Sequence, residues 1–297
     1  MVQRFEGEYY YLVKCFGREL NHKFFKVSFH LNIMEMNEKI KQICKNLEKE
    51  KKIKILFAIE NGSRAWRMSS KDSDYDVRFV YFRPIEDYIQ INKHQEVIQV
   101  TFDKEGNKVP VEGSFIDLSG FDVLKYAKML SDSNPTTIEW LVTDIVYYGK
   151  QNKVFKDFAI KNFSKISLYH HYKSMCRNNY LKYLKSGSDV TYKRYLYAFR
   201  GLLNAKWVAH KKTIPPISFP KALEKSKDLI SENILKKIKE IIRLKSQGKE
   251  KSIIQNIVKF DELIEEFLKD DSEAPKEKSH ATLIELNNEL KKVILNL

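Results

Sequence analysis

A short polar segment between two apolar runs constrains the fold of this chain more than any other feature. Ile53–Ile59 has the composition of a buried strand, and the turn residues Gly62 and Ser63 follow it. Ten residues separate Ser63 from Asp74, which stands directly before Tyr75–Phe82, a second run with the pattern of a strand. The segment therefore predicts a strand, a tight Gly-Ser turn and carboxylates that enter a second strand.

The same segment carries the groups that a phosphate and a divalent cation require. Backbone N–H groups of Gly62 and Ser63, with the Ser63 hydroxyl group, can hold a phosphate. Asp74, Asp76 and Arg78 alternate along the predicted strand, so their side chains project from one face. Mg²⁺ binds one or two carboxylates plus substrate phosphates, and two ions roughly 3.5–4 Å apart can stabilise an entering hydroxyl group and a leaving pyrophosphate. We therefore expect Asp74 and Asp76 to hold Mg²⁺ or Mn²⁺.

A change of pattern near residue 150 predicts two domains, at 34–150 and 151–297. Before the change we also expect a helix, a hairpin and two short helices: Met36–Lys51, Glu96–Phe102 with Val109–Asp117, a helix after Gly120, and Thr136–Val142. After it, strand patterns nearly vanish and long helical segments follow, the last beyond a polar linker near 270–280: Ser164–Lys185, Asp189–His210, Glu232–Lys245, Ile253–Leu268 and Thr282–Leu297. The predicted fold class is α+β, a small mixed-sheet domain followed by an all-helical C-terminal domain, with Glu139 and Trp140 closing the junction.

Residues 1–33 stand apart from this pattern. They contain the Tyr- and Phe-rich stretches Tyr9–Val13 and Phe24–Ile33, whose aromatic and β-branched residues favour extended structure. Two explanations stay open: the segment is a hairpin added to the domain, or it lies upstream of the true start of the protein.

The charge balance of the chain favours polyanionic partners. Its 53 Lys and Arg residues exceed its 39 Asp and Glu residues, which gives a net charge of +14 and promotes binding to phosphates through counterion release. Its 3 Cys residues lie far apart, which excludes a disulfide framework and leaves buried thiols as the expectation. No stretch approaches the ~20 apolar residues that span a bilayer, and the first residues lack an apolar leader. We expect a cytoplasmic protein with no membrane partner; the sequence gives no signal for its oligomeric state.

One predicted helix, Asp189–His210, carries a basic and aromatic stripe. The residues at helical spacing on this face are Lys193, Tyr197, Arg200 and Asn204. The residues on the opposite side, expected to form core, are Leu196, Phe199, Leu203 and Trp207. Lys and Arg neutralise phosphates and Tyr stacks on a base, so Lys193, Tyr197 and Arg200 are candidate nucleotide ligands. A solvated helix face with Tyr197 half buried is the alternative.

Strand, Gly-Ser turn, ten residues and a carboxylate pair together form the signature of the DNA polymerase beta-like nucleotidyltransferase superfamily. More closely, the chain resembles the predicted nucleotidyltransferase family that includes the RNA-ligase-associated protein of T-even phages. The likeness is carried by Gly62–Trp66 and Ser73–Arg78. Further matches extend it over about Met36 to Phe219: Asp117–Asp122, Ser133–Pro135, Glu139–Leu141, His171-Tyr172, Tyr195–Ala198 with Arg200, and Pro215-Pro216.

The chain departs from the family's pattern at a few positions. Arg67 follows the tryptophan of the turn where the family usually has glycine, and Asn61 stands in place of serine. Phe121 replaces a usual tryptophan, and Thr143-Asp144 replace serine-proline. Arg67 lies in the turn itself, so the nucleotide preference can differ, but none of the departures touches the carboxylates.

The resemblance implies a third carboxylate on a neighbouring strand. Asp117, at the end of the predicted strand Val109–Asp117, is preferred; the alternative, Asp122, could equally be a first-turn acid on the following helix. Without a metal role, Asp117 would be a helix N-cap. The implied metal ligands are Asp74, Asp76 and Asp117, and the implied nucleotide contacts near them are Gly62, Ser63, Arg64 and Arg78.

The activity that the resemblance implies is metal-dependent transfer of a nucleoside monophosphate from a nucleoside triphosphate to an acceptor hydroxyl group, with release of pyrophosphate. Such catalysis depends on positioning and charge neutralisation. An RNA end is the favoured acceptor, because of the phage relatives and the positive charge, and a protein side chain comes second. A nucleic-acid-binding module whose carboxylates do no chemistry is the alternative of another class, and the intact turn and carboxylates argue against it.

Overall fold

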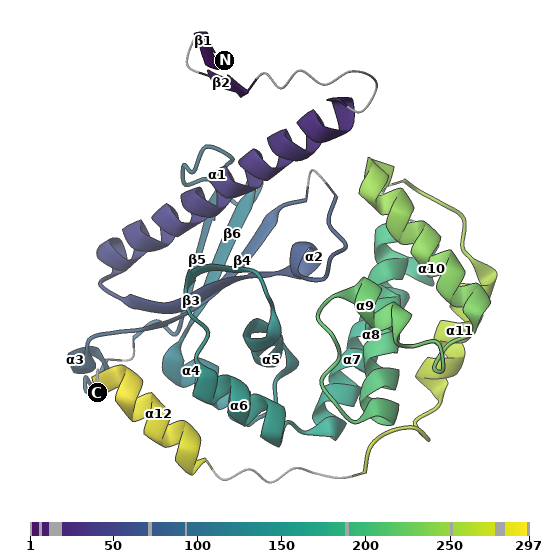
Figure 1. Cartoon of the computed structure of the whole chain (residues 1–297). Coiled ribbons are helices and arrows are strands. Elements are labelled where there is room, and N and C mark those ends of the chain that lie inside the picture. Colours follow the sequence, from purple (N-terminus) through teal and green to yellow (C-terminus); the bar gives the residue numbers. More distant parts are fainter. Residues whose placement is uncertain are drawn as a thin grey trace.

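The fold consists of a mixed sheet covered by helices and followed by a helical region (Figure 1). The computed structural model describes residues 2–5, 8–11, 20–70, 73–92, 94–187, 190–249, 252–276 and 283–295, with side chains from residue 34 onward except at Lys249. This architecture confirms the predicted α+β fold class.

The central sheet brings three strand ends to one edge. Its strands, in spatial order, are β5 (Val97–Phe102), β6 (Ile116–Asp122), β4 (Tyr75–Phe82), β3 (Lys54–Asn61) and β7 (Val146–Gly149). β4 and β6 run parallel, so both begin at the same edge. β3 runs antiparallel to β4, so β3 ends there. The residues around the Gly-Ser turn therefore meet the first residues of β4 and β6.

The strands predicted on either side of the turn are present, whereas the predicted hairpin is wrong in its second strand. Lys108 and Val109 pair with β5, but residues 110–115 do not form a strand, and Gly113 there has a φ of 109°. β6 begins at Ile116 and continues through Gly120. A Cβ atom at Gly120 would lie 2.2 Å from the Phe79 ring, so this glycine permits close packing within a strand and does not end it.

Helices cover both faces of the sheet. On one face, α1 (Leu20–Lys51) packs its Ile43 and Leu47 against Val77 and Phe79 of β4. The helices nearest the other face are α4 (Val123–Ser131), α5 (Pro135–Val142) and α6 (Lys153–Asn162). That face, which includes Val80, shares one hydrophobic core with the helical region, so the sheet and the C-terminal helices stabilise each other.

Beyond residue 150 the described residues form helices without a further strand, as predicted. These helical elements are α7 (Lys165–Asn179), η1 (Tyr180–Leu184), α8 (Tyr192–Lys211), α9 (Phe219–Glu224), α10 (Glu232–Leu244), η2 (Lys245–Lys249), α11 (Val258–Lys269) and α12 (Ile284–Leu295). α8 packs against α7, α9, α10 and α11, which makes it the central helix. The last helix, α12, returns to α6, where Asn152 Nδ2 donates to Glu289 Oε1 at 2.7 Å (Figure 1).

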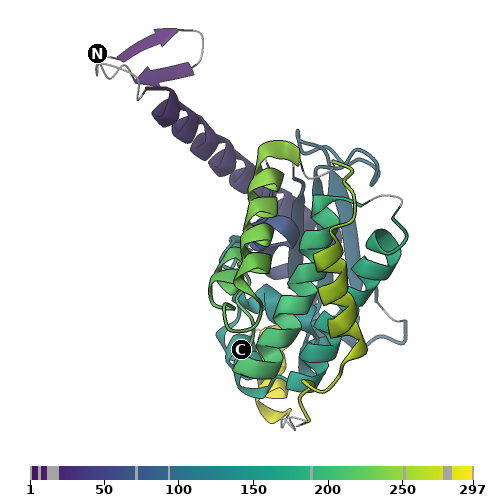
Figure 2. The ribbon, with the colours of Figure 1, turned by 90° about the vertical axis from the view of Figure 1, so that its right-hand side faces the viewer.

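The N-terminal segment forms a hairpin of its own and the beginning of α1. β1 (Val2–Phe5) and β2 (Glu8–Tyr11) pair only with each other in a two-stranded sheet. Figure 2 shows them and the first turns of α1 projecting from the rest of the chain. The expectation of extended structure for Phe24–Ile33 is wrong, because these residues belong to α1. Extending a helix adds one hydrogen bond per residue without a new nucleus, which outweighs the strand preference of aromatic residues.

Two smaller expectations can be compared with the structure. Cys44 and Cys176 are buried free thiols, and burial raises the pKa of each to about 12. Cys15 lies outside the residues whose side chains are described. None of the helices in the described ranges combines the length and the apolar character needed to cross a bilayer.

We predict that a chain beginning at Met34 keeps its thermal midpoint to within about 2 °C, since β1 and β2 do not extend the central sheet and the described buried residues of α1 begin at Ile40. Differential scanning calorimetry of the full and the shortened chain measures this. Aggregation of the shortened chain, or a midpoint lower by about 5 °C or more, would show that residues 1–33 stabilise the domain.

Candidate active site

Strand register places two of the predicted carboxylates side by side. Asp76 is the direct partner of Asp117 across the parallel pair β4–β6, and of Asn61 across the antiparallel pair β3–β4. Asp74 precedes β4 by one residue and is exposed. Asp76 and Arg78 alternate with Val77, which faces α1, so they project toward the helical region. The site is thus open to contributions from both parts of the chain.

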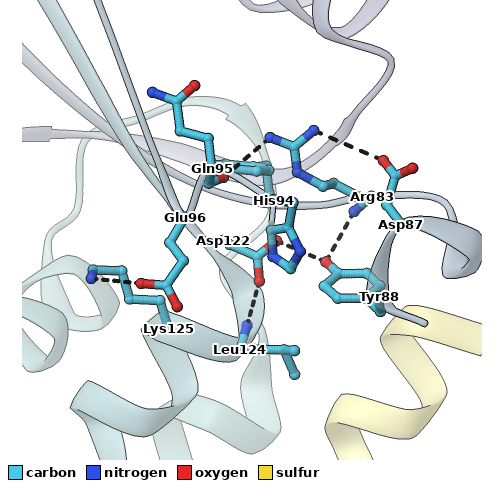
Figure 3. A network of polar contacts seen from close by, with 10 residues as sticks. Arg83, Asp87, Tyr88, His94, Gln95, Glu96, Asp122, Leu124 and Lys125 are labelled. Carbon is cyan, nitrogen blue, oxygen red and sulfur yellow. Dashed lines mark hydrogen bonds and ion pairs between the residues drawn. The ribbon is translucent and has the colours of Figure 1, made fainter. Parts of the chain in front are cut away.

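Asp122, the alternative third carboxylate, lies far from this group. It stands five positions after Asp117 in β6, roughly 17 Å along the extended chain. Its side chain is 0 % exposed and caps α4 by accepting from the Leu124 N–H at 2.9 Å. It also accepts from the Tyr88 hydroxyl group at 2.8 Å and lies 3.5 Å from His94 Nε2 (Figure 3). The geometry therefore favours Asp117 and gives Asp122 a structural role.

The Gly-Ser turn packs directly against Asp76. Gly62 has a φ of 64° and begins the short helix α2 (Gly62–Ala65). A Cβ atom at Gly62 would lie 2.0 Å from Asp76 Oδ2, so only glycine allows the carboxylate to approach the turn this closely. Ser63 follows as a buried residue of α2. The predicted phosphate-holding turn and the predicted metal ligand are therefore in contact.

Arg78 holds the two carboxylates together. Its Nη2 atom lies 2.9 Å from Asp117 Oδ2 and 3.6 Å from Asp76 Oδ1. Burial raises the pKa of Asp76; the charges of Arg78 and Lys193 oppose this shift, while those of Asp117 and Asp74 add to it. Two carboxylates in register would repel each other, and the guanidinium group between them offsets that repulsion.

The carboxylate oxygens of Asp76 and Asp117 are the candidate ligands for a divalent cation. Asp117 Oδ1 is buried and has no hydrogen-bond partner, which leaves one oxygen beside Asp76 available to a cation. Among the residues that the structure describes, no three His, Cys, Asp or Glu side chains converge as a complete metal cluster. Mg²⁺ does not require one, because it binds one or two carboxylates together with waters and substrate phosphates. The pair Asp76 and Asp117 meets that requirement.

A buried acid that the motif did not reveal supports the same edge. Glu60 is 0 % exposed, accepts from the Tyr147 hydroxyl group at 2.5 Å and accepts from the Asp76 backbone N–H at 3.1 Å. Burial raises the pKa of Glu60 to about 8, against the lowering effect of these hydrogen bonds. Glu60 thereby fixes the backbone from which Asp76 projects. The sequence signal was an acidic residue directly after the apolar run Ile53–Ile59.

Arg64 is engaged in the loop before β4. Its guanidinium group donates to the carbonyl oxygens of Ser73 and Asp74 and lies 3.8 Å from the centre of the Tyr75 ring. Through these three contacts Arg64 stabilises the loop that leads to the carboxylates. Its predicted contact with a nucleotide stays a prediction.

Two departures from the family's pattern contact each other. Arg67, where glycine is usual, has a φ of 57°, which is the left-handed region that glycine adopts most readily. Its Nη2 atom lies 2.7 Å from Asp144 Oδ1, and Asp144 stands where the family usually has proline. The ion pair links the turn to the end of α5, so the two replacements are coupled through a direct contact.

The helical region reaches the site through the first turns of α8. The positive charge of Lys193 lowers the pKa of Asp76, so the ammonium group lies within electrostatic range of the carboxylates. Tyr197, one turn later, packs edge-on against Trp66 at a ring separation of 5.6 Å. Lys245, which the sequence analysis did not single out, is buried with its ammonium group 5.6 Å from the Tyr197 ring centre. Tyr197 thus contacts the tryptophan that follows the turn, and the predicted contacts of Lys193 and Tyr197 with a nucleotide stay predictions.

Arg200, a candidate nucleotide ligand from the sequence, is instead buried in an ion pair. Arg200 is 2 % exposed, lies 2.5 Å from Glu139 Oε1 and stacks on Trp66 at 3.9 Å. The Tyr172 hydroxyl group donates to the same Glu139 oxygen at 2.9 Å. Helices cover α8 on several sides. The basic and aromatic stripe is therefore buried where it reaches Arg200. This pair confirms the expectation that Glu139 closes the junction between the two parts.

Comparison with known proteins identifies relatives over most of the chain. A family model described as "RNA repair pathway DNA polymerase beta family" matches residues 36–292. The chain is 33% identical over 267 residues to the uncharacterized protein YcgL of Bacillus subtilis, which covers 88% of this chain and 96% of YcgL. A nucleotidyltransferase-like protein from Exiguobacterium sibiricum matches 86% of this chain and 90% of its own, at 13% identity and a TM-score of 0.28, a score too low to support an argument.

We predict that Gly62→Ala lowers the free energy of unfolding by about 1–3 kcal/mol, because the new Cβ atom must displace Asp76 and the backbone is left-handed. Gly248→Ala is the matched control: φ is 84° there, but no atom lies within 4 Å of the added Cβ. Urea unfolding of both variants separates the contact from the backbone strain. Equal losses would mean that Asp76 does not constrain the turn.

We also predict that Arg200→Ala lowers the free energy of unfolding by about 3–5 kcal/mol, because it leaves the buried Glu139 carboxylate without its partner. The half-buried Lys193 is the control on the same helix, and Lys193→Ala should cost less than about 0.5 kcal/mol. If the two variants unfold at the same urea concentration, the buried ion pair does not hold the junction.

Proposed function

This chain belongs to the RNA repair pathway DNA polymerase beta family, and we propose that it is a metal-dependent nucleotidyltransferase. It would move a nucleoside monophosphate from a nucleoside triphosphate to an acceptor hydroxyl group and release pyrophosphate. The single observation that carries the proposal is the contact between the Gly62 turn and Asp76, with Asp117 in register beside it. The turn that would hold a phosphate is thus in contact with one of two neighbouring carboxylates.

The triphosphate would bind between the turn and α8. Backbone N–H groups of Gly62 and Ser63, with the Ser63 hydroxyl group, would hold its terminal phosphates. Lys193 would neutralise phosphate charge from the opposite side, which its electrostatic effect on Asp76 supports. Arg78 remains a candidate nucleotide contact, since its guanidinium group already lies between the two carboxylates.

Asp76 and Asp117, with the exposed Asp74 beside them, would hold Mg²⁺ or Mn²⁺. The bound ion supplies positive charge to the phosphates and to the oxygen atoms that enter and leave. In the reaction the acceptor oxygen forms a bond to the α-phosphorus, and the bond from that phosphorus to the oxygen bridging to the β-phosphate breaks. The hydroxyl proton needs an acceptor, for which we assign the carboxylate of Asp117, in register beside Asp76. Glu60 keeps Asp76 in place through its backbone N–H.

An RNA end is the proposed acceptor. The description of the family places its members in an RNA repair pathway, and the net charge of +14 suits a polyanionic substrate. Incubation of the protein with each of the four labelled ribonucleoside triphosphates and a small RNA tests this directly. Label on the RNA supports the proposal, whereas label on a copurified protein would move the acceptor to a protein side chain.

We predict that Asp76→Asn abolishes transfer while the free energy of unfolding near pH 7 holds or rises. Burial raises the pKa of Asp76, so the folded protein holds the charged form at a cost that the neutral amide removes. Asp103→Asn, in an exposed loop, is the control and should transfer at the rate of the unchanged chain. Retained turnover in Asp76→Asn, or full activity in excess chelator, would refute the metal-dependent mechanism.

A further inference from the structure

A surface hollow in the helical region has the chemistry of a nucleic-acid contact. It has a volume of about 630 Å³, within the range of ligand pockets. It lies where the end of α7 and the π-helical segment η1 face the first turn of α8. Its lining residues are Asn178, Asn179, Leu181, Lys182, Tyr183 and Arg194.

Two cations converge on one aromatic ring in this hollow. The guanidinium carbon of Arg194 lies 3.5 Å from the centre of the Tyr183 ring, and the Lys182 ammonium group lies 5.1 Å from it. Hydrogen bonding and charge from Lys182, together with Arg194, lower the pKa of Tyr183. Neither cation has a carboxylate within ion-pair distance in the part of the chain that the structure describes. The positive charge is therefore directed at the ring and remains available to a ligand.

The hollow and the proposed active site draw on consecutive residues of α8. Arg194 directly follows Lys193, whose charge acts on Asp76. The Asn178 amide, exposed at the end of α7, can donate to and accept from a base edge. An unpaired nucleotide presents a flat base, a phosphate and a polar base edge. The ring and the guanidinium plane suit the base, the cations suit the phosphate, and the amide suits the base edge.

We propose that this hollow binds the acceptor strand as single-stranded RNA, with a base stacked on Tyr183 or on the plane of Arg194 and a phosphate held by Lys182 and Arg194. The inference rests on the proposed function, because it assigns the acceptor of that site to a surface. An acidic protein segment would also attract the cations, but it would not use the aromatic ring as a stacking platform.

A second basic hollow provides the control for charge alone. It has a volume of about 1120 Å³ and its cations are Lys45, Lys49, Lys52, Lys54 and Arg83. It lies at the start of β3, whereas the active site lies at the end of that strand, roughly 23 Å away. Removing one exposed lysine there changes the net charge as Arg194→Ala does, without touching the proposed contact.

Fluorescence anisotropy with a labelled single-stranded RNA of about 12 nucleotides tests the inference without triphosphate or metal. Tyr183→Ala and Arg194→Ala should each weaken binding about tenfold or more, and Arg194→Ala should also reduce the slope of log K against log salt by about 0.7. Lys49→Ala should stay within about twofold of the unchanged chain. The inference is overturned if the unchanged chain does not bind this RNA, or if Tyr183→Ala and Arg194→Ala weaken binding no more than Lys49→Ala.

A separate measurement distinguishes failure of this inference from failure of the proposed function. Transfer to RNA is measured with the unchanged chain and with the hollow variants, because the proposed metal ligands are not part of the hollow. If no triphosphate supports transfer but the hollow variants still weaken RNA binding, the proposed function fails and the RNA surface stands. If transfer to RNA occurs and the hollow variants bind normally, the hollow is excluded and the transfer reaction stands.

Discussion

Placement of Asp76 beside Asp117, across the parallel strands β4 and β6, is the constraint on which the rest of the site depends. Two carboxylates in register repel each other unless a cation lies between them. Here Arg78 contacts both, and the N–H group of Asp76 is held by Glu60. The Gly62 turn can approach because it has no side chain. Arg78 therefore offsets the charge of the pair, while Glu60 and Gly62 fix the position of Asp76.

The helical region completes the site and stabilises it through different residues of one helix. Lys193 and Tyr197, in the first turns of α8, lie near Asp76 and Trp66. Arg200, further along, is buried against Glu139 and stacks on the ring of Trp66. Because Trp66 directly follows α2, the position of the Gly-Ser turn depends on how α8 packs. Sheet and helices therefore act as parts of one structure, with a shared hydrophobic core.

The local parts of the site could be predicted from the sequence, whereas the parts that depend on tertiary packing could not. The Gly-Ser turn and the strand with Asp76 follow from spacing and alternation within a single segment. The sequence favoured Asp117 over Asp122, but the geometric reason is strand register, which was hidden because Gly120 looks like a strand end when its packing partner Phe79 is unknown. Helical periodicity placed Arg200 on the face of Lys193, but periodicity does not reveal how many sides of a helix are covered. Glu60 accepts hydrogen bonds from the Tyr147 hydroxyl group of β7 and from the Asp76 backbone N–H of β4. Because both donors lie far from Glu60 in the sequence, no local pattern predicted them.

Manganese binding by two matched variants tests the central claim most directly. Asp117→Asn and Asp122→Asn each replace one carboxylate of β6 by an amide of the same shape, at opposite ends of the strand. Titration of Mn²⁺ in the presence of a non-hydrolysable triphosphate, followed by electron paramagnetic resonance, should give binding about tenfold weaker or worse for Asp117→Asn. Asp122→Asn should bind Mn²⁺ as the unchanged chain does. Normal binding by Asp117→Asn would contradict the claim that the register of β4 and β6 creates the metal site.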